Sequence, residues 1–195
     1  MVALAGPWVT VANHQANVYR PPVNTSDAVD YYADEGVAQH KIVIGIPLYG
    51  RSFLNTDGPG TPYSGVGEGS WDAGIYDYRA LPLPGSKVYY DKDAIASWSY
   101  DNGTREMISF DDEKIAERKG EWVMEEGLRG CMFWELSGDK GGTRDGVETG
   151  PGKDPQPGES LVSVVKKAFG TLDQSSNWLQ YEGSQYDNMR KGMQT

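Results

Sequence analysis

Side chains able to contact a ligand stand at the ends of two apolar runs. The run 41–46 leads to Tyr49 and Arg51, and the later run 130–136 contains Trp134. A tyrosine hydroxyl donates and accepts hydrogen bonds, a guanidinium fork holds carbonyl oxygens, and an indole offers a flat apolar face. Parallel α/β folds place ligand sites at the carboxyl ends of their strands. We therefore interpret the two strand ends as parts of one binding rim of a barrel.

Charge and aromatic content narrow the class of partner. The chain has 28 acidic and 18 basic side chains and a formal net charge of −10. Nucleic acids and anionic membranes are bound by clustered cations, so this balance argues against both and favours a neutral substrate. Six Trp and twelve Tyr stand against four Phe. Rings with a polar edge suit sugars, although we expect most of them in ordinary cores.

Targeting signals and modification patterns are few. No apolar stretch reaches the roughly 18 residues of a membrane-spanning helix. Met1 is followed by no basic region and by too short an apolar segment, so we expect no signal peptide. The triplets that begin at Asn24 and Asn102 match the acceptor pattern for N-glycosylation.

Metal and thiol chemistry are not expected. Cys131 is the single cysteine and lies in an apolar run, so we interpret it as a buried structural thiol without a disulfide partner. The chain has two histidines without metal-ligand spacing, and we interpret His14 as a hydrogen-bonding loop residue. We expect no metal and no cofactor.

The elements that must position these side chains follow an alternating order. Ser26 is a candidate N-cap for a helix that ends at Gly36. The run 41–46 has no polar alternation, which is typical of a strand buried on both faces in a parallel sheet. A helix capped by Asp111 or Asp112 and stopped near Gly127 precedes the strand 130–136. A last helix, with apolar residues from Leu161 to Ala168, closes at Gly170.

A different pattern fills residues 54–110, which are rich in Gly, Tyr and Trp. The segments 87–90, 95–100 and 106–110 are β-prone. Asn102-Gly103 lies between the last two and predicts a hairpin turn in which both residues take positive φ. We expect a small antiparallel domain inserted into a parallel architecture.

Several separated motifs give the chain a specific resemblance. They are Tyr49-Gly50-Arg51-Ser52-Phe53, Gly65-Val66-Gly67, Ser70-Trp71-Asp72-Ala73-Gly74-Ile75 and Met132-Phe133-Trp134-Glu135, with His14-Gln15-Ala16-Asn17 and Tyr186-Asp187-Asn188 near the ends. In this order they resemble family 18 glycoside hydrolases, and the match is closest to fungal extracellular chitinases.

The resemblance implies an α/β fold, namely the C-terminal part of a (β/α)8 TIM barrel with an α+β insertion domain between strands seven and eight. Residues 1–53 would be the barrel part that ends in strand seven. Residues 54–125 would hold the insertion domain and lead into the last barrel helix. Residues 126–195 would hold strand eight, the final helix and the tail.

The implied activity is hydrolysis of β-1,4-linked N-acetylglucosamine in chitin, with retention and with assistance from the substrate's own acetamido oxygen. The family's acid lies in a D-x-x-D-x-D-x-E motif, which the chain lacks. The nearest run, 27–35, has its third acid two places late and reads as a charged helix surface. Val2 and Ala3 occupy the tyrosine and aspartate places of the family's M-x-Y-D stretch. We therefore name no catalytic residue.

The resemblance also implies a substrate-binding set. Trp134 would floor the sugar pocket, Tyr49 and Arg51 would line the cleft beyond strand seven, and Trp71 with Asp72 would face it from the insertion. Trp134 could instead be a core residue, and Arg51 could pair with an acid or serve both roles. Many relatives have Glu at the place of Asp72, whose reach is shorter. Strand alternation predicts that Glu135 points away from Trp134.

Three hypotheses follow. The first is an inactive C-terminal fragment of a chitinase, the second a non-catalytic remnant that binds chitin, and the third a scaffold or a non-functional product. Chitin or a chito-oligosaccharide is the expected partner, and the resemblance implies an extracellular location. A strand as apolar as 41–46 must pack against neighbouring strands and helices, and the sequence provides only a few of the barrel strands. We therefore expect poor solubility or self-association through exposed barrel strands.

Overall fold

A computed structural model describes residues 10–20, 22–141, 150, 152–176 and 179–192. Its helices and strands, in chain order, are α1 (Thr25–Asp34), η1 (Gln39–Lys41), β1 (Val43–Pro47), β2 (Tyr49–Phe53), β3 (Ile75–Asp77), η2 (Tyr78–Ala80), β4 (Lys87–Asp91), β5 (Ala96–Asp101), β6 (Glu106–Phe110), α2 (Glu113–Glu125), β7 (Gly130–Trp134), η3 (Leu136–Gly138), α3 (Leu161–Phe169) and α4 (Asp187–Arg190).

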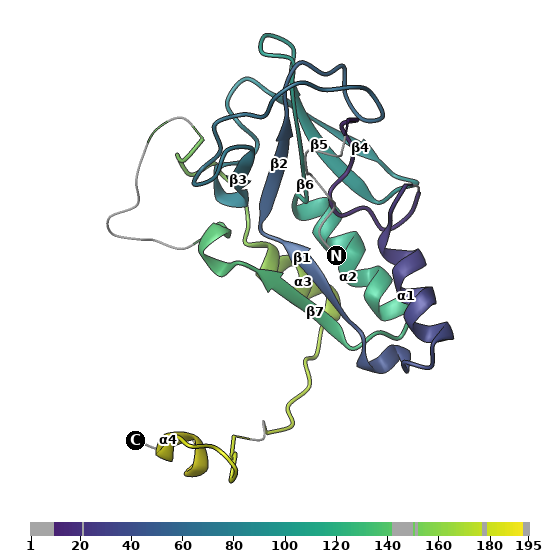
Figure 1. The fold of residues 1–195 in the computed structure, drawn as a ribbon, viewed down its shortest axis with the longest axis vertical. Helices are drawn as coiled ribbons and strands as arrows, with labels where there is room; N and C mark the ends of the chain where they lie inside the picture. The colour runs from purple at the N-terminus through teal and green to yellow at the C-terminus, as the bar shows by residue number, and fades with distance from the viewer. Residues whose placement is uncertain (1–9, 21, 142–149, 151, 177–178, 193–195) are drawn as a thin grey trace.

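The strands form two sheets (Figure 1). β1 and β7 pair in parallel, with Pro47 opposite Trp134, and the other five strands form an antiparallel sheet in the order β3-β2-β6-β5-β4. In Figure 1 the antiparallel sheet stands above the β1–β7 pair, and α4 lies apart from the body at the end of an extended segment. The mixture of parallel and antiparallel parts agrees with the expected α/β class and with an inserted antiparallel unit. The antiparallel sheet already begins at Tyr49, before the expected start at residue 54.

The helices cover one face of the parallel pair. Ile44 packs in a cluster with Val29 of α1 and Trp122 of α2, and Ile46 packs in a second cluster with Val165 of α3. The other face is open, because Val43 is 49% exposed. The expectation that this strand is buried on both faces is therefore wrong among the described residues, which supply strand neighbours and helices on one side only.

Most helix boundaries agree with the sequence patterns. Asp112 caps α2 and Gly127 follows it with φ 62°, while Ser160 caps α3 and Gly170 ends it with φ 69°. For α1 the expected cap was wrong. The cap is Asn24, two residues before Ser26, and its carboxamide oxygen accepts a hydrogen bond from the Asp27 N–H.

The β5–β6 hairpin forms as expected, but its turn does not. Asn102 and Gly103 keep negative φ, and Arg105 takes the left-handed conformation at φ 53° instead. The Asp101 carboxylate accepts hydrogen bonds from the N–H groups of Gly103 and Thr104 at 2.6 and 3.3 Å. An aspartate side chain that accepts hydrogen bonds from the backbone two and three residues later stabilises its own type of turn. Asp101, rather than the Asn-Gly pair, therefore determines this turn.

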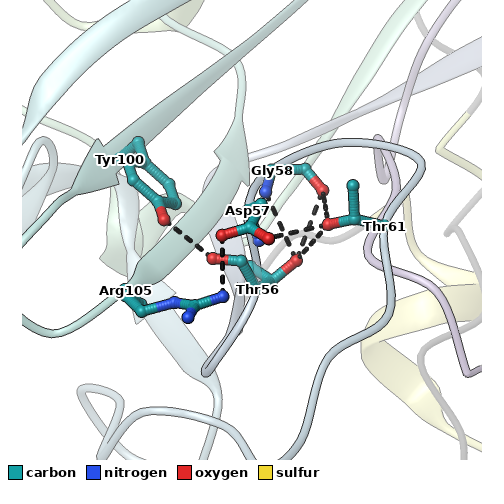
Figure 2. A network of polar contacts seen from close by, with 6 residues as sticks. All are labelled: Thr56, Asp57, Gly58, Thr61, Tyr100 and Arg105. Atoms are coloured by element: carbon teal, nitrogen blue, oxygen red, sulfur yellow. Dashed lines mark hydrogen bonds and ion pairs between the residues drawn. The ribbon is translucent and has the colours of Figure 1, made fainter.

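A polar network fixes the loop after β2 to this hairpin. Figure 2 shows Tyr100 donating to the Thr56 carbonyl at 2.7 Å and Arg105 paired with Asp57 at 2.7 Å. The hydroxyls of Thr56 and Thr61 lie 2.7 Å apart and close the loop on itself. The network holds the far end of β2, whose other end carries Tyr49 and Arg51.

Candidate functional site

The five side chains expected to bind substrate border one cavity. Tyr49, Arg51, Trp71, Asp72 and Trp134 all line a space of about 380 Å³. They come from β2, from the loop before β3 and from the end of β7. Residues that are up to 85 positions apart (134 − 49) in the sequence are thus brought together by the fold.

The junction between the two sheets places Tyr49 beside Trp134. Only Leu48, which is fully buried, separates β1 from β2. Its N–H donates to the Trp134 carbonyl at 2.8 Å, and its own carbonyl accepts from the Tyr78 N–H at 2.9 Å. Leu48 therefore ties the end of the parallel pair to the start of the antiparallel sheet.

Tyr49 and Arg51 lie on the same face of β2 because side chains alternate along a strand. The Arg51 guanidinium carbon is 5.9 Å from the centre of the Tyr49 ring. Burial raises the pKa of the Tyr49 hydroxyl, and the charge of Arg51 opposes this shift in part. Tyr49 is therefore a neutral phenol at physiological pH, able to donate as well as accept a hydrogen bond.

A second cavity of about 350 Å³ shares Tyr49, Arg51 and Trp134 with the first and extends along β1 and β7. Gln15 lines it, and its carboxamide N–H donates to the Tyr49 carbonyl at 2.6 Å. Gln15 belongs to a motif that carried the family resemblance, but sequence reasoning gave it no role. Its carboxamide oxygen and the Arg51 Nε are buried without a hydrogen-bond partner in the described structure.

Trp134 and Glu135 are neighbours at the edge of the same cavity. β7 ends at Trp134, the Trp134–Glu135 peptide bond is cis, and both residues line the cavity of about 380 Å³. Glu135 is exposed and accepts a hydrogen bond from the Ser137 hydroxyl. Trp134 itself is 66% exposed, so it is not a core residue in this structure.

Trp71 is an exposed residue whose ring is held by a hydrogen bond. Trp71 is 62% exposed, yet its indole N–H donates to the Asp77 carboxylate at 2.9 Å. Asp72 is also exposed. Sequence reasoning missed Asp77. The signal that could have found it is an acidic residue at the end of an apolar strand, two places before the basic Arg79.

The other sequence expectations have separate outcomes. The acids of the run 27–35 lie on the exposed side of α1, as expected of surface charge. Val2 and Ala3 lie outside the described residues. Cys131 is free, and burial raises the pKa of its thiol to about 12, which agrees with an unreactive structural role. In the described part of the chain no three His, Cys, Asp or Glu side chains gather to hold a metal, and no helix is long and apolar enough to cross a membrane.

The two glycosylation patterns lie in different environments. Asn24 is 7% exposed, and its carboxamide both caps α1 and donates to the Asp27 carboxylate at 2.7 Å. A glycan on this nitrogen would have to be accommodated where the side chain is buried and bound to Asp27. Asn102 lies exposed in the β5–β6 loop, so it stays the better acceptor.

A larger cavity of about 800 Å³ borders η3 and α3. Two pairs of its polar lining groups bind each other: Asp139 accepts from the Ser160 hydroxyl at 2.6 Å, and Lys167 pairs with Glu159 at 2.6 Å. The cavity of about 380 Å³, which the five expected substrate-binding residues line, is the better candidate site.

Comparison with known proteins gives consistent matches. Residues 2–139 match the family model of the glycosyl hydrolases family 18. Chitinase 1 of Aphanocladium album and endochitinase 1 of Metarhizium robertsii are each 42% identical to the chain over 196 residues. These alignments cover 97% of this chain and 43% of each relative, so the chain spans less than half the length of these relatives.

Solved chitinases share the fold. A chitinase from Bacillus thuringiensis is similar with a TM-score of 0.70 and 29% identity, covering 87% of this chain and 31% of that protein. A class V chitinase from Nicotiana tobaccum, solved in complex with NAG4, is similar with a TM-score of 0.68 and 23% identity. That match covers 83% of this chain and 44% of the plant protein.

Proposed function

The chain belongs to family 18 of the glycosyl hydrolases, and from this premise we propose that it forms the part of a chitinase-type cleft that binds β-1,4-linked N-acetylglucosamine oligosaccharides. One observation carries the proposal. The five residues that the family resemblance selected from three separate motifs line a single cavity. We further propose that β1 and β7 correspond to barrel strands seven and eight, with the insertion domain between them.

The side chains suit a neutral, hydroxyl-rich and amide-bearing substrate. The exposed Trp134 indole can stack on the C–H face of a pyranose without leaving a polar group unpaired. The neutral Tyr49 hydroxyl and the Arg51 guanidinium can bind hydroxyl and acetamido oxygens. The net charge of −10 gives no attraction for a polyanion, which supports a neutral polymer as ligand.

Hydrolysis needs a group that the 195 residues do not supply in the family's form. Substrate-assisted cleavage requires a general acid that protonates the leaving oxygen, and the D-x-x-D-x-D-x-E motif is not in the sequence. Three acids border the cavity. Asp72 and Glu135 are exposed to water and lack the apolar enclosure typical of such an acid, and Asp77 is held in an ion pair by Arg79. We propose binding without turnover by these residues, in an extracellular setting like that implied by the family.

Retention on chitin tests this function. We expect Trp134→Ala to lower the retained fraction, with affinity falling by about tenfold for a lost stacking contact of about 1.4 kcal/mol. Tyr31→Ala is a matched control, because Tyr31 is 63% exposed on α1 and lies away from the cleft. Equal retention of wild type and Trp134→Ala, above a measurable background, would show that the cleft is not the binding site.

A further inference from the structure

We infer that Asp77 is a positioning residue that fixes the orientation of the Trp71 ring at the cleft. Trp71 is 62% exposed and Asp77 only 8% exposed, and the indole N–H of the first donates to the carboxylate of the second at 2.9 Å. An exposed ring is thus fixed by one edge to a buried charge. The inference rests on the proposed function for the meaning of this orientation, but not for its existence.

Asp77, the anchor of the Trp71 ring, is itself held in place by its neighbours. Arg79 is buried, and its Nε and Nη2 both lie 3.0 Å from the same Asp77 oxygen that accepts from Trp71. The Asp77 N–H donates to the Ser70 hydroxyl at 3.0 Å, so the backbone is tied to the residue before Trp71. A buried carboxylate with a buried cationic partner keeps its position better than an exposed pair, because neither group is free to exchange its partner for water.

Contacts with a segment distant in sequence restrict the ring further. The Ser70 hydroxyl donates to the Gly152 carbonyl at 2.6 Å, which fixes the segment around Gly152 to the loop that carries Trp71. The ammonium group of Lys153, in that segment, lies 5.4 Å from the centre of the Trp71 ring. Lys153 does not line the cavity that Trp71 borders. One face of the indole is therefore occupied by a cation outside the cleft, which leaves the rest of the ring for a ligand.

A preset orientation matters for a neutral sugar. Stacking is weak and depends on the angle between ring and pyranose, and an unanchored indole must lose rotamer freedom when the ligand binds. Asp77 and Arg79 remove this cost before binding, as expected of groups that support a contact residue. Asp77 also borders the cavity, but its Oδ2 is already bound by Trp71 and Arg79. The effect should therefore appear in ligand affinity through the Trp71 ring.

The first test uses the ligand-free full chain and the indole N–H signals in NMR. Trp71 and Trp134 are 62% and 66% exposed, so exposure alone predicts similar hydrogen exchange of their indole protons. The anchor predicts exchange about tenfold slower at Trp71, as for a proton held by a charge-assisted hydrogen bond. Trp71→Phe assigns the signal. Equal exchange at the two residues would overturn the inference.

Variants then distinguish loss of the Trp71–Asp77 hydrogen bond from a general loss of stability in the region. Asp77→Asn, and the double change Asp77→Asn with Arg79→Gln in case Arg79 cannot stay buried alone, should both speed exchange at Trp71. Tyr78→Phe is the matched control. It removes a nearby part-buried hydrogen bond, from the Tyr78 hydroxyl to the Glu159 carbonyl at 3.0 Å, without touching Trp71. Exchange that speeds equally in Tyr78→Phe would show loosening of the region, not an anchor, and would overturn the inference.

The binding arm uses chitotetraose. We expect the Asp77 variants to weaken its Kd by about tenfold and Tyr78→Phe to leave it unchanged. If wild type shows the slow indole proton but binds no tetraose, the proposed function fails and the anchor stands. If wild type binds tetraose and the Asp77 variants bind it equally well with a fast-exchanging Trp71, the positioning role is overturned and the proposed function stands.

Discussion

At the scale of single residues, the residues that line the cleft are held by partners from elsewhere in the sequence. Tyr49, Arg51 and Trp134 could be selected from their places after apolar runs, and Trp71 and Asp72 from the family motif. Their supporting residues act through space. Asp77 is tied to Trp71 by an indole hydrogen bond, and Gln15 reaches the Tyr49 carbonyl from 34 residues away, a pairing that no local pattern encodes.

His14 illustrates a residue whose environment sets its chemistry. It packs 5.3 Å from Trp98, and its Nδ1 is buried without a partner in the described structure. Burial lowers its pKa below 6.5, and the charges of Lys119 and Arg20 lower it further while Asp91 opposes them. Below pH 6.5 the unfolded chain therefore binds a proton that the folded chain does not, so stability should fall as the pH falls.

We predict that His14→Phe, which keeps a ring but cannot titrate, reduces this loss of stability. The measurement is the change in Tm between about pH 7.5 and about pH 5 in dilute protein. His40→Gln is the matched control, since the other histidine is exposed on η1. An unchanged pH dependence in His14→Phe would contradict the assigned role of burial.

At the scale of elements, local signals worked where the capping residue adjoins the helix. Asp112, one of two candidate caps, and Gly170 were placed correctly from sequence. The cap of α1 was misplaced because Asn24 and Ser26 are both good caps and tertiary contacts choose between them. The β5–β6 turn was mistaken because the Asp101 carboxylate competes with the Asn-Gly preference.

Gly50 shows how tightly β2 sits on the core beneath the site. A Cβ at this position would lie 2.7 Å from Leu81 Cδ1 and 2.8 Å from Ile108 Cγ2. We predict that Gly50→Ala lowers the free energy of unfolding by about 1–3 kcal/mol through overpacking. Urea unfolding measures it.

Gly183→Ala provides the control for Gly50→Ala, because nothing lies within 4 Å of its added Cβ. We expect this change to alter stability by less than about 0.5 kcal/mol, as is usual for a surface substitution. If both variants unfold at the same urea concentration, the packing at β2 is looser than the distances imply.

At the scale of the whole molecule, the sequence predicted the combination of parallel and antiparallel parts but not how open the parallel pair is. Met132 and Leu136 are 48% and 70% exposed, beside the exposed Val43 and Trp134. A continuous apolar run predicts that both faces of a strand are covered. It does not predict which face the described residues cover.

This open face predicts self-association. Among the described strands β1 pairs with β7 alone, so each has an unpaired edge next to exposed apolar side chains. Val43→Lys should lower association by placing a charge at this edge. Light scattering across a concentration series measures it, with Tyr31→Lys on α1 as the control. A wild-type chain that stays monomeric at every concentration would contradict the prediction.

The central claim is that these residues bind a chito-oligosaccharide without cleaving it. Titration of the full chain with chitotetraose, followed by the Trp134 indole signal and by mass analysis of the sugar, tests it in one experiment. We predict a saturable shift of the Trp134 signal and an intact tetraose at the end. No shift at about millimolar tetraose, where binding is worth only about −4.1 kcal/mol, would contradict the binding site. Release of shorter sugars by the purified chain would contradict the absence of turnover.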